Sequence, residues 1–373
     1  MQTDLPLDLL GGLSADAFMR RYWQKKPLLI RQALPGFAPP VARARLFALA
    51  ADEGVESRLV ARDGTAWSVR KGPFKRRALP PLGRRDWTLL VQGVDVHDDA
   101  VHALMNRFRF VPDARLDDVM VSFATDGGGV GPHFDSYDVF LLQAHGKRRW
   151  RIGRQRNAQL RDDVPLKILA HFEPEQEYLL APGDMLYLPP GWAHDGIAEG
   201  ECLTYSVGFR VPEQAELGRE LLARLADEGD ATGRVLYRDA GQAAVQAPAE
   251  VPQALAAFAR QAVEHVLAEP LALERALGEF LTEPKANVWF DPAPMQGGED
   301  GLVLDRRTRM LFDSRHVFIN GESFLASGKD ARLMRKLANQ RFLGPSDMRT
   351  AGPGAMALLG AWGYAGWLHA TEV

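Results

Sequence analysis

The spacing of apolar side chains changes twice along the chain, and these changes divide it into three parts. Up to about residue 95, short helical and extended patterns alternate with Pro and Gly, and they predict a helix over 14–23 and a strand over 27–31. From residue 116 to 210 the apolar residues form short runs rich in β-branched and aromatic side chains, as strands do. After residue 212 they recur at the spacing that is typical of helices.

The middle part is predicted to be a compact all-β unit. The expected strands are 118–124, 137–144, 148–152, 177–181, 185–188 and 203–209. Turn residues fill the gaps between them, for example the three glycines 127–129 and the Pro-Pro-Gly sequence 189–191. Because a parallel sheet would need a long crossover between strands, this dense succession predicts a barrel or jelly roll.

The part after residue 212 is expected to contain two units. Residues 213–300 carry 16 acidic and 7 basic side chains, whereas residues 301–373 carry 6 acidic and 10 basic ones, so a boundary near Gly301 is expected. The later segment contains Asn320-Gly321, which predicts a hairpin turn, and an amphipathic helix over 330–340. We therefore expect an α+β protein with a mainly β first domain (1–212, β core at about 95–212), a helical segment (213–300) and a small winged-helix unit (301–373).

Composition is that of an ordinary soluble protein, with 46% apolar and 25% charged residues and a net charge of −3. One stretch departs from this balance: residues 70–85 hold seven basic side chains and no acidic one. We favour a solvated surface there over an RNA contact, and direct nucleic-acid binding stays open. The single cysteine, Cys202, excludes an internal disulfide and fits a reducing compartment. Without a signal peptide or a long apolar run, the protein is expected to be cytoplasmic, with no membrane partner.

Candidate metal chemistry depends on histidine and carboxylate, since cysteine is nearly absent. His133 and Asp135 are two residues apart, a spacing that places two side chains on the same side of a strand. His194 follows a turn, a short apolar strand and a second turn, so it is expected at the start of the next strand. Two imidazoles and one carboxylate are the ligands of non-haem Fe(II) oxygenases, which predicts iron bound by His133, Asp135 and His194.

The same segments resemble the Jumonji C branch of the 2-oxoglutarate oxygenases, and most closely the bacterial ribosomal oxygenases. The motifs that carry the resemblance span most of the chain: residues 22–31 (YWQKKPLLIR), 127–135 (GGGVGPHFD), 137–140 (YDVF), 146–150 (GKRRW) and 205–210 (YSVGFR). The resemblance implies a double-stranded β-helix (cupin or jelly-roll) catalytic domain over 1–212, a helical dimerisation segment that makes a homodimer, and a C-terminal winged helix. It also implies Fe(II), 2-oxoglutarate and molecular oxygen as cofactor and cosubstrates, and 3-hydroxylation of an arginine in a large-subunit ribosomal protein.

Three further residues receive roles at this point. A bidentate cation suits the distal carboxylate of 2-oxoglutarate, and Arg148 is the candidate because alternation places Arg149 and Arg151 on the opposite face. The resemblance matches Arg148 to the family's 2-oxoglutarate arginine and Ser122 to the hydroxyl that assists it. An arginine substrate needs a carboxylate near the metal, and Asp126, in the turn before the glycines, is preferred to Asp138.

Two other functions remain open from the sequence. The same reaction on a methyl group would make the protein an N-methyl-lysine demethylase, and the metal ligands alone do not separate the two. A cupin-like metal-binding module without catalysis is the non-enzymatic alternative. Arg148 discriminates against that module, which needs no cation next to the metal.

Overall fold

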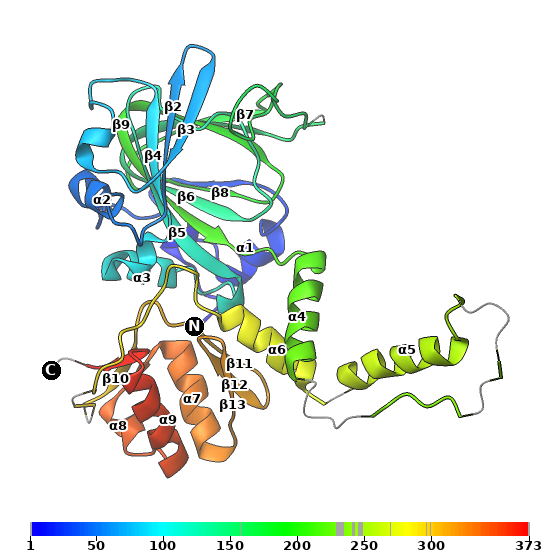
Figure 1. Ribbon diagram of the computed structural model, residues 1–373. Helices are drawn as coiled ribbons and strands as arrows, with labels where there is room; N and C mark the ends of the chain where they lie inside the picture. The colour runs from blue at the N-terminus through cyan, green and yellow to red at the C-terminus, as the bar shows by residue number, and fades with distance from the viewer. Residues whose placement is uncertain are drawn as a thin grey trace. The chain divides into compact units, whose positions relative to one another are not determined.

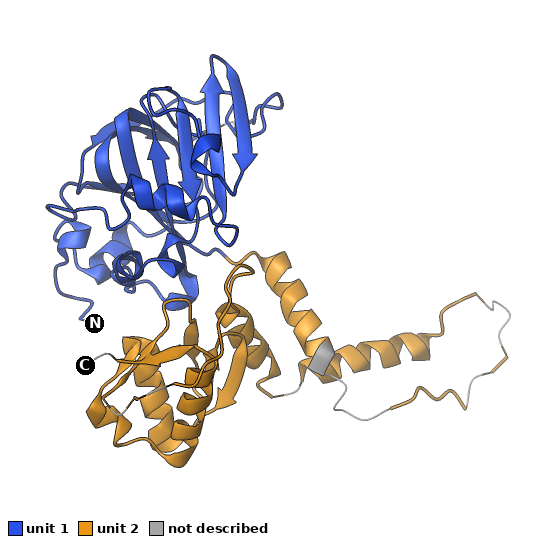
Figure 2. Ribbon diagram, turned by 60° about the vertical axis from the view of Figure 1, so that its left-hand side comes forward, with its two compact units in different colours: residues 1–211 blue, residues 212–373 orange. Residues whose placement is uncertain are grey.

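The computed structural model describes residues 2–156, 158–228, 235–240, 243–244, 249–268, 270–295, 297–298 and 300–371. The chain forms two compact units, residues 1–211 and 212–373, which are coloured separately in Figure 2. The break at Val211 and Pro212 lies next to the boundary that the change of apolar spacing indicates.

The first unit contains three α-helices and nine strands in its described residues (Figure 1). The helices are α1 (Ala15–Arg21), α2 (Arg43–Leu49) and α3 (Asp99–Asn106). The strands are β1 (Leu28–Ile30), β2 (Ser57–Asp63), β3 (Ala66–Lys71), β4 (Trp87–Val91), β5 (Leu116–Ala124), β6 (Val139–Gly153), β7 (Gln176–Leu180), β8 (Met185–Leu188) and β9 (Ala193–Phe209).

The strands form one continuous antiparallel sheet in the order β1-β8-β6-β9-β5-β4-β2-β3, with β7 also paired to β6. The long strands β6 and β9 pair along almost their whole length, and β8 and β7 bind successive halves of β6. This is the jelly-roll architecture expected of residues 116–210. The sheet extends further than the predicted β core at 95–212, because β1 to β4 belong to it as well.

Strand β6 differs from the two strands that were predicted at 137–144 and 148–152. The strand continues through His145 and Gly146, and the pairing with β9 shifts register on both sides of His145. Such a shift is a β-bulge rather than a turn. Gly146 has φ of 63°, and a Cβ there would lie 2.0 Å from the carbonyl oxygen of Glu201, so only glycine fits.

Aromatic side chains anchor the core of this unit. The hydroxyl of Ser14 caps α1 by accepting from the backbone N–H of Ala17 at 3.1 Å, and the helix then buries Phe18 completely. Phe18 contacts Phe140 on β6 and Tyr187 on β8 with ring centroids 5.4 and 5.0 Å apart. Burying each such ring stabilises the fold by about 1.5–3 kcal/mol. The strands that position the candidate site are therefore held by a packed aromatic core.

The second unit holds the remaining elements. Its helices are α4 (Gln214–Glu228), α5 (Gln253–Leu267), α6 (Ala272–Thr282), α7 (Gly328–Gln340), α8 (Pro345–Met348) and α9 (Pro353–Tyr364). Its strands are β10 (Leu302–Leu304), β11 (Met310–Phe312), β12 (His316–Ile319), β13 (Glu322–Leu325), β14 (Phe342–Leu343) and β15 (Leu368–Ala370). Two small sheets, β14-β10-β15 and β11-β12-β13, enclose a core with α7 and α9.

Local sequence signals are accurate in this unit. Asn320 and Gly321 both have positive φ, 47° and 89°, as a two-residue turn between β12 and β13 requires. The apolar stripes at Leu217 and Leu255 lie on α4 and α5, as their spacing predicts. Among the described residues, no helix is long and apolar enough to cross a membrane.

The basic stretch of residues 70–85 is exposed at every one of its seven cationic side chains. Arg85 forms an ion pair with Asp126, and Arg70 and Arg76 lie over the rings of Phe74 and Phe47. This fits the solvated surface that was favoured.

Candidate functional site

Three side chains with metal-binding atoms meet in the first unit: His133, Asp135 and His194. Their ligand atoms all lie within 4.8 Å of one another. The carboxylate of Asp135 places Oδ2 3.6 Å from His194 Nε2 and Oδ1 4.0 Å from His133 Nε2. These separations leave space for one ion at about 2 Å from each atom. Two imidazoles and a carboxylate on one side of an ion fit Fe(II) with open positions opposite.

The backbone fixes which ring nitrogen of each histidine faces the cluster. His133 Nδ1 lies 2.9 Å from the carbonyl oxygen of Gly131, and His194 Nδ1 lies 3.0 Å from that of Trp192. A carbonyl oxygen only accepts hydrogen bonds, so each Nδ1 is assigned the proton and each Nε2 is free to bind metal. His133 and His194 also exchange backbone hydrogen bonds of 3.0 and 2.7 Å, which fixes their separation.

Burial decides the charge of these groups. His194 is 3% exposed, and desolvation together with the adjacent His133 lowers its pKa to about 3, so at neutral pH it is uncharged and able to bind metal. Burial raises the pKa of Asp135, while His133 and a hydrogen bond from the Tyr137 hydroxyl oppose that rise. Burial and the carboxylate of Asp135 also raise the pKa of Tyr137. The phenol therefore stays protonated and donates to the carboxylate.

The segment that carries the first two ligands is less regular than expected. His133 makes a single β-bridge with His194, and residues 134–138 are not part of a strand. Phe134 therefore does not pack behind the pair as a strand would place it; it is 41% exposed and lines the cavity described below. The preceding glycines allow this close approach, because a Cβ on Gly129 would lie 2.6 Å from the carbonyl oxygen of Gly196 on β9.

The three side chains line a cavity of about 520 Å³ inside the β-helix. Arg148 on β6 faces the same cavity and is 5% exposed. Its Nη1 donates to Ser122 Oγ at 3.4 Å, whereas its Nε and Nη2 have no hydrogen-bond partner among the residues described. A buried cation with free donors is costly unless an anion binds to it. The geometry fits a carboxylate held by Arg148 and Ser122.

The neighbouring arginines face outward, as alternation along β6 predicts. Arg149 forms ion pairs with Glu177 on β7 and Glu199 on β9, and Arg151 pairs with Asp195. Neither is among the residues that line the cavity. Arg148 is thus the arginine of this strand that is available to a cosubstrate.

The structure does not bring Asp126 to the cavity. Its carboxylate forms an ion pair with Arg85 at 2.8 Å and accepts from the backbone N–H of Gly200 at 2.9 Å, in the outer turn between β5 and the glycines. Its rival Asp138 is fully buried and accepts from the hydroxyl of Tyr187 at 2.6 Å. Neither lines the cavity, so the sequence argument from proximity in the chain is not supported for either residue.

Sequence reasoning missed several residues that do line the cavity. Asp118 and Met120 precede Ser122 on β5 at two-residue spacing, so all three project from the same face of the strand. That alternation was visible in the sequence and could have identified Asp118. Arg58 lines the cavity from β2, a strand that the sequence did not predict. The other polar side chains of the lining that were missed are Thr88, Gln92, Asp117, Tyr137, Lys167 and Ser206.

Comparison with known proteins agrees with this geometry. Residues 103–217 match the JmjC domain family, and residues 264–369 match the ROXA-like winged helix family. The second match begins ahead of the boundary that was expected near Gly301, and so includes α6. The chain is 36% identical over 321 residues to the ribosomal protein uL16 3-hydroxylase of Escherichia coli K12, covering 82% of this chain and 84% of that protein. It is 38% identical over 210 residues to a probable ribosomal oxygenase of Haemophilus influenzae, covering 55% and 52%.

Solved structures extend the likeness to nearly the whole chain. The X-ray structure of Escherichia coli YcfD matches with a TM-score of 0.84 and 31% identity, covering 95% of this chain and 98% of that one. A structure of the same ribosomal oxygenase in complex with cobalt and 2-oxoglutarate matches with a TM-score of 0.79 and 32% identity, covering 94% and 96%. The chain therefore belongs to the JmjC ribosomal oxygenases that carry a ROXA-like winged helix.

Proposed function

We propose that this protein is an Fe(II)- and 2-oxoglutarate-dependent oxygenase that 3-hydroxylates an arginine side chain of ribosomal protein uL16. The observation that carries the proposal is the joint presence, in one cavity, of the His133, Asp135 and His194 cluster and the buried Arg148, two of whose guanidinium nitrogens have no hydrogen-bond partner in the described part of the chain. Fe(II) held by this cluster would couple oxygen activation to the oxidative decarboxylation of 2-oxoglutarate. A metal-binding module without catalysis has no use for the cation.

The residues that line the cavity have different roles. Arg148 and Ser122 bind and orient the distal carboxylate of 2-oxoglutarate in the cavity. Tyr137 donates to Asp135 and so fixes the orientation of the carboxylate that binds the metal. His133 and His194 each direct the Nδ1–H to a backbone carbonyl, which leaves Nε2 of each ring to bind the metal.

The substrate arginine requires a carboxylate, and we assign that role to Asp118 in place of Asp126. Asp118 is 8% exposed, lines the cavity from β5 and accepts from the backbone N–H of Gly93 at 3.0 Å, which fixes its position. Met120 and Tyr137 line the same cavity and offer apolar surface to the methylenes of an arginine side chain. A charged guanidinium placed against a fixed, desolvated carboxylate binds by charge-assisted hydrogen bonds.

Succinate formation and mass spectrometry together test the assignment. With Fe(II), 2-oxoglutarate and uL16, the protein should release succinate and add one oxygen to a single arginine of uL16. Asp118→Asn should reduce this hydroxylation while uncoupled 2-oxoglutarate turnover persists, and Asp126→Asn should leave both unchanged. Equal hydroxylation by the wild type and Asp118→Asn would remove Asp118 from the substrate site. Formaldehyde release without a retained oxygen would instead assign N-methyl demethylation, and no succinate at all would favour the metal-binding module.

The helical segment supports a homodimer. Helix α5 has no buried residue, and its apolar side chains Val263 and Leu267 are 56% and 50% exposed, as is Leu222 of α4 at 54%. An amphipathic helix with an uncovered apolar face is stabilised by burying that face against a partner. Light scattering should show a dimer for the wild type, and a monomer for Val263→Glu/Leu267→Glu and after deletion of residues 213–373. A monomeric wild type would rule out the proposed homodimer.

Since ribosomal proteins are made in the cytoplasm, we place the protein there.

A further inference from the structure

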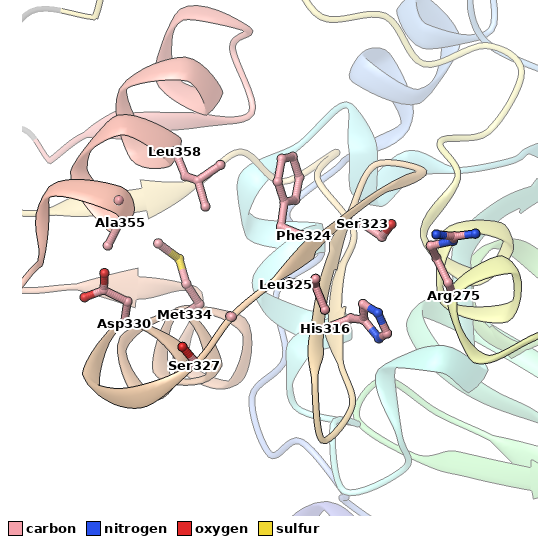
Figure 3. Close-up of a pocket in the computed structure, with 12 residues that line it drawn as sticks. Arg275, His316, Ser323, Phe324, Leu325, Ser327, Asp330, Met334, Ala355 and Leu358 are labelled. Atoms are coloured by element: carbon pink, nitrogen blue, oxygen red, sulfur yellow. The ribbon is translucent and has the colours of Figure 1, made fainter. Parts of the chain in front are cut away.

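A groove in the second unit runs along the free edge of strand β13. Within the described residues β13 pairs only with β12, so its other edge has no neighbouring strand. A hollow of about 670 Å³ follows this edge and is lined from both faces of the strand. Figure 3 shows the hairpin with Phe324 and Leu325, the side chains of Met334, Ala355 and Leu358 on one side of it, and Arg275 on the other.

The backbone of β13 presents unused hydrogen-bonding groups to this groove. Ala326 N–H donates to Arg315 O at 3.0 Å, and the register of the hairpin then makes Phe324 and Val317 the next hydrogen-bonded pair. The N–H and C=O groups of Ser323 and Leu325 therefore point away from β12, and none of the described residues bonds to them there. An exposed strand edge of this kind accepts another strand.

Side chains beside the groove decide what kind of strand fits. Leu325 is 78% exposed, a large apolar group that a bound segment would cover. An adjoining hollow of about 760 Å³ shares Leu325 and is lined by three arginines, Arg315, Arg332 and Arg335. Asp330 is the acidic group in the described lining of the two hollows, and its carboxylate accepts from the backbone N–H of Gly352. The described lining of the two hollows is thus mainly apolar and cationic. Outside it, the carboxylate of Glu279 accepts from the hydroxyl of Ser323.

We propose that this groove is a peptide-docking site, in which an extended segment of a partner protein with alternating apolar and acidic side chains adds a strand to β13. Main-chain hydrogen bonds to Ser323 and Leu325 would supply affinity, and the arginines would select acidic flanks. RNA would satisfy the arginines alone and would leave both Leu325 and the strand edge uncovered. A peptide uses all three features, which is why it is the favoured partner.

Fluorescence anisotropy on the full-length protein tests the site. The probes are two fluorescein-labelled short peptides, one alternating Glu with Val and one alternating Lys with Val, together with a short single-stranded RNA. The Glu/Val peptide should bind with a dissociation constant below about 1 mM and more tightly than either other probe. Tighter binding of the Lys/Val peptide or of RNA, or no binding of the Glu/Val peptide, would overturn the proposal.

Matched variants locate the binding. Arg332 and Arg349 are both exposed arginines of this unit, and of the two Arg332 lines the hollow that adjoins the groove. Arg332→Glu should raise the dissociation constant of the Glu/Val peptide by about tenfold, and Arg349→Glu should raise it by less than about twofold. Leu325→Pro removes one outward N–H and is tolerated at a strand edge, so it should abolish binding, whereas Leu325→Thr should preserve most of it.

Each of these variants also has a result that refutes the docking site. Equal affinities for the two arginine variants, or for Leu325→Pro and Leu325→Thr, would place the peptide elsewhere. A loss of dimer in light scattering with Leu325→Pro would show that a second copy of the chain occupies the edge. Hydroxylation of free uL16 by Arg332→Glu should match the wild type, because Arg332 belongs to the second unit and every residue assigned to the oxygenase site belongs to the first.

Discussion

Removing the guanidinium of Arg148 is the sharpest test of the cosubstrate site. The side chain is 5% exposed, with one weak hydrogen bond of 3.4 Å to Ser122 and two nitrogens without a described partner. A hydrogen bond between charged groups contributes about 1.5–3 kcal/mol. Since about 1.4 kcal/mol is a factor of ten, Arg148→Ala should raise the KM for 2-oxoglutarate by between about tenfold and about a hundredfold. Arg148→Lys should recover part of this loss, because an ammonium keeps the charge but lacks the planar fork.

The measurement is succinate formation against 2-oxoglutarate concentration at saturating Fe(II). Arg149→Ala is the matched control, since Arg149 is adjacent in the sequence but faces outward to Glu177 and Glu199. Its KM should equal that of the wild type. If Arg148→Ala leaves the KM for 2-oxoglutarate unchanged, or if Arg149→Ala raises it equally, the carboxylate does not bind where the cavity geometry indicates.

A second readout separates this binding role from a structural one. Arg148 carries the desolvation cost of a buried cation, and no ion pair among the described residues offsets it, so Arg148→Met should leave the free energy of unfolding unchanged or raise it. In the presence of Fe(II), 2-oxoglutarate should raise the Tm of the wild type and not that of the variant. A large loss of stability in Arg148→Met without 2-oxoglutarate would mean that the arginine mainly supports the fold.

Three other predictions follow from the site and from the second unit. His133→Ala, Asp135→Ala and His194→Ala should each abolish succinate formation while circular dichroism stays native, with the exposed His171→Ala as an active control; full activity in any of the three would contradict the iron site. Tyr137→Phe removes the donor to Asp135 and should raise the Fe(II) concentration needed for half activity by about tenfold, measured by metal titration; an unchanged requirement would deny the phenol its orienting role. Burial raises the pKa of Asp305, but hydrogen bonds from Arg307 and His369 outweigh it and hold that pKa at about 2. This depressed pKa stabilises the fold by about 2 kcal/mol above pH 4, and the contribution is lost as pH falls through about 2. Asp305→Asn should therefore lower the free energy of unfolding at pH 7. Chemical denaturation at a series of pH values should also show a smaller fall of this free energy between about pH 4 and pH 2 than in the wild type. An unaltered fall would refute the assignment.

Sequence patterns predicted the elements whose conformation is determined by neighbouring residues. A two-residue hairpin turn needs positive φ at two consecutive residues, and Asn320 and Gly321 are residue types that adopt it readily. The hairpin can therefore be predicted from these two residues alone. Strand β6 was divided in two for the converse reason. Gly146 resembles a turn glycine in the sequence, yet its positive φ serves a bulge that is set by pairing with β9, about fifty residues later. Pairing partners of that kind are not visible in a single strand's pattern.

The candidate site shows the same division between local and long-range causes. His133, Asp135 and His194 were identified because metal binding limits the residue types to a few and their spacing matches strands and turns. The carboxylate for the substrate is not limited in that way, since many aspartates lie near the ligands in the chain. Asp126 is seven residues from His133 but points to Arg85, whereas Asp118 is fifteen residues away and shares a strand face with Ser122. Distance along the chain therefore does not indicate which of these carboxylates lines the cavity, whereas the strand face that carries Ser122 does. For this fold, residues at two-residue spacing from Ser122 or Arg148 are the first places to seek further contacts with the substrate.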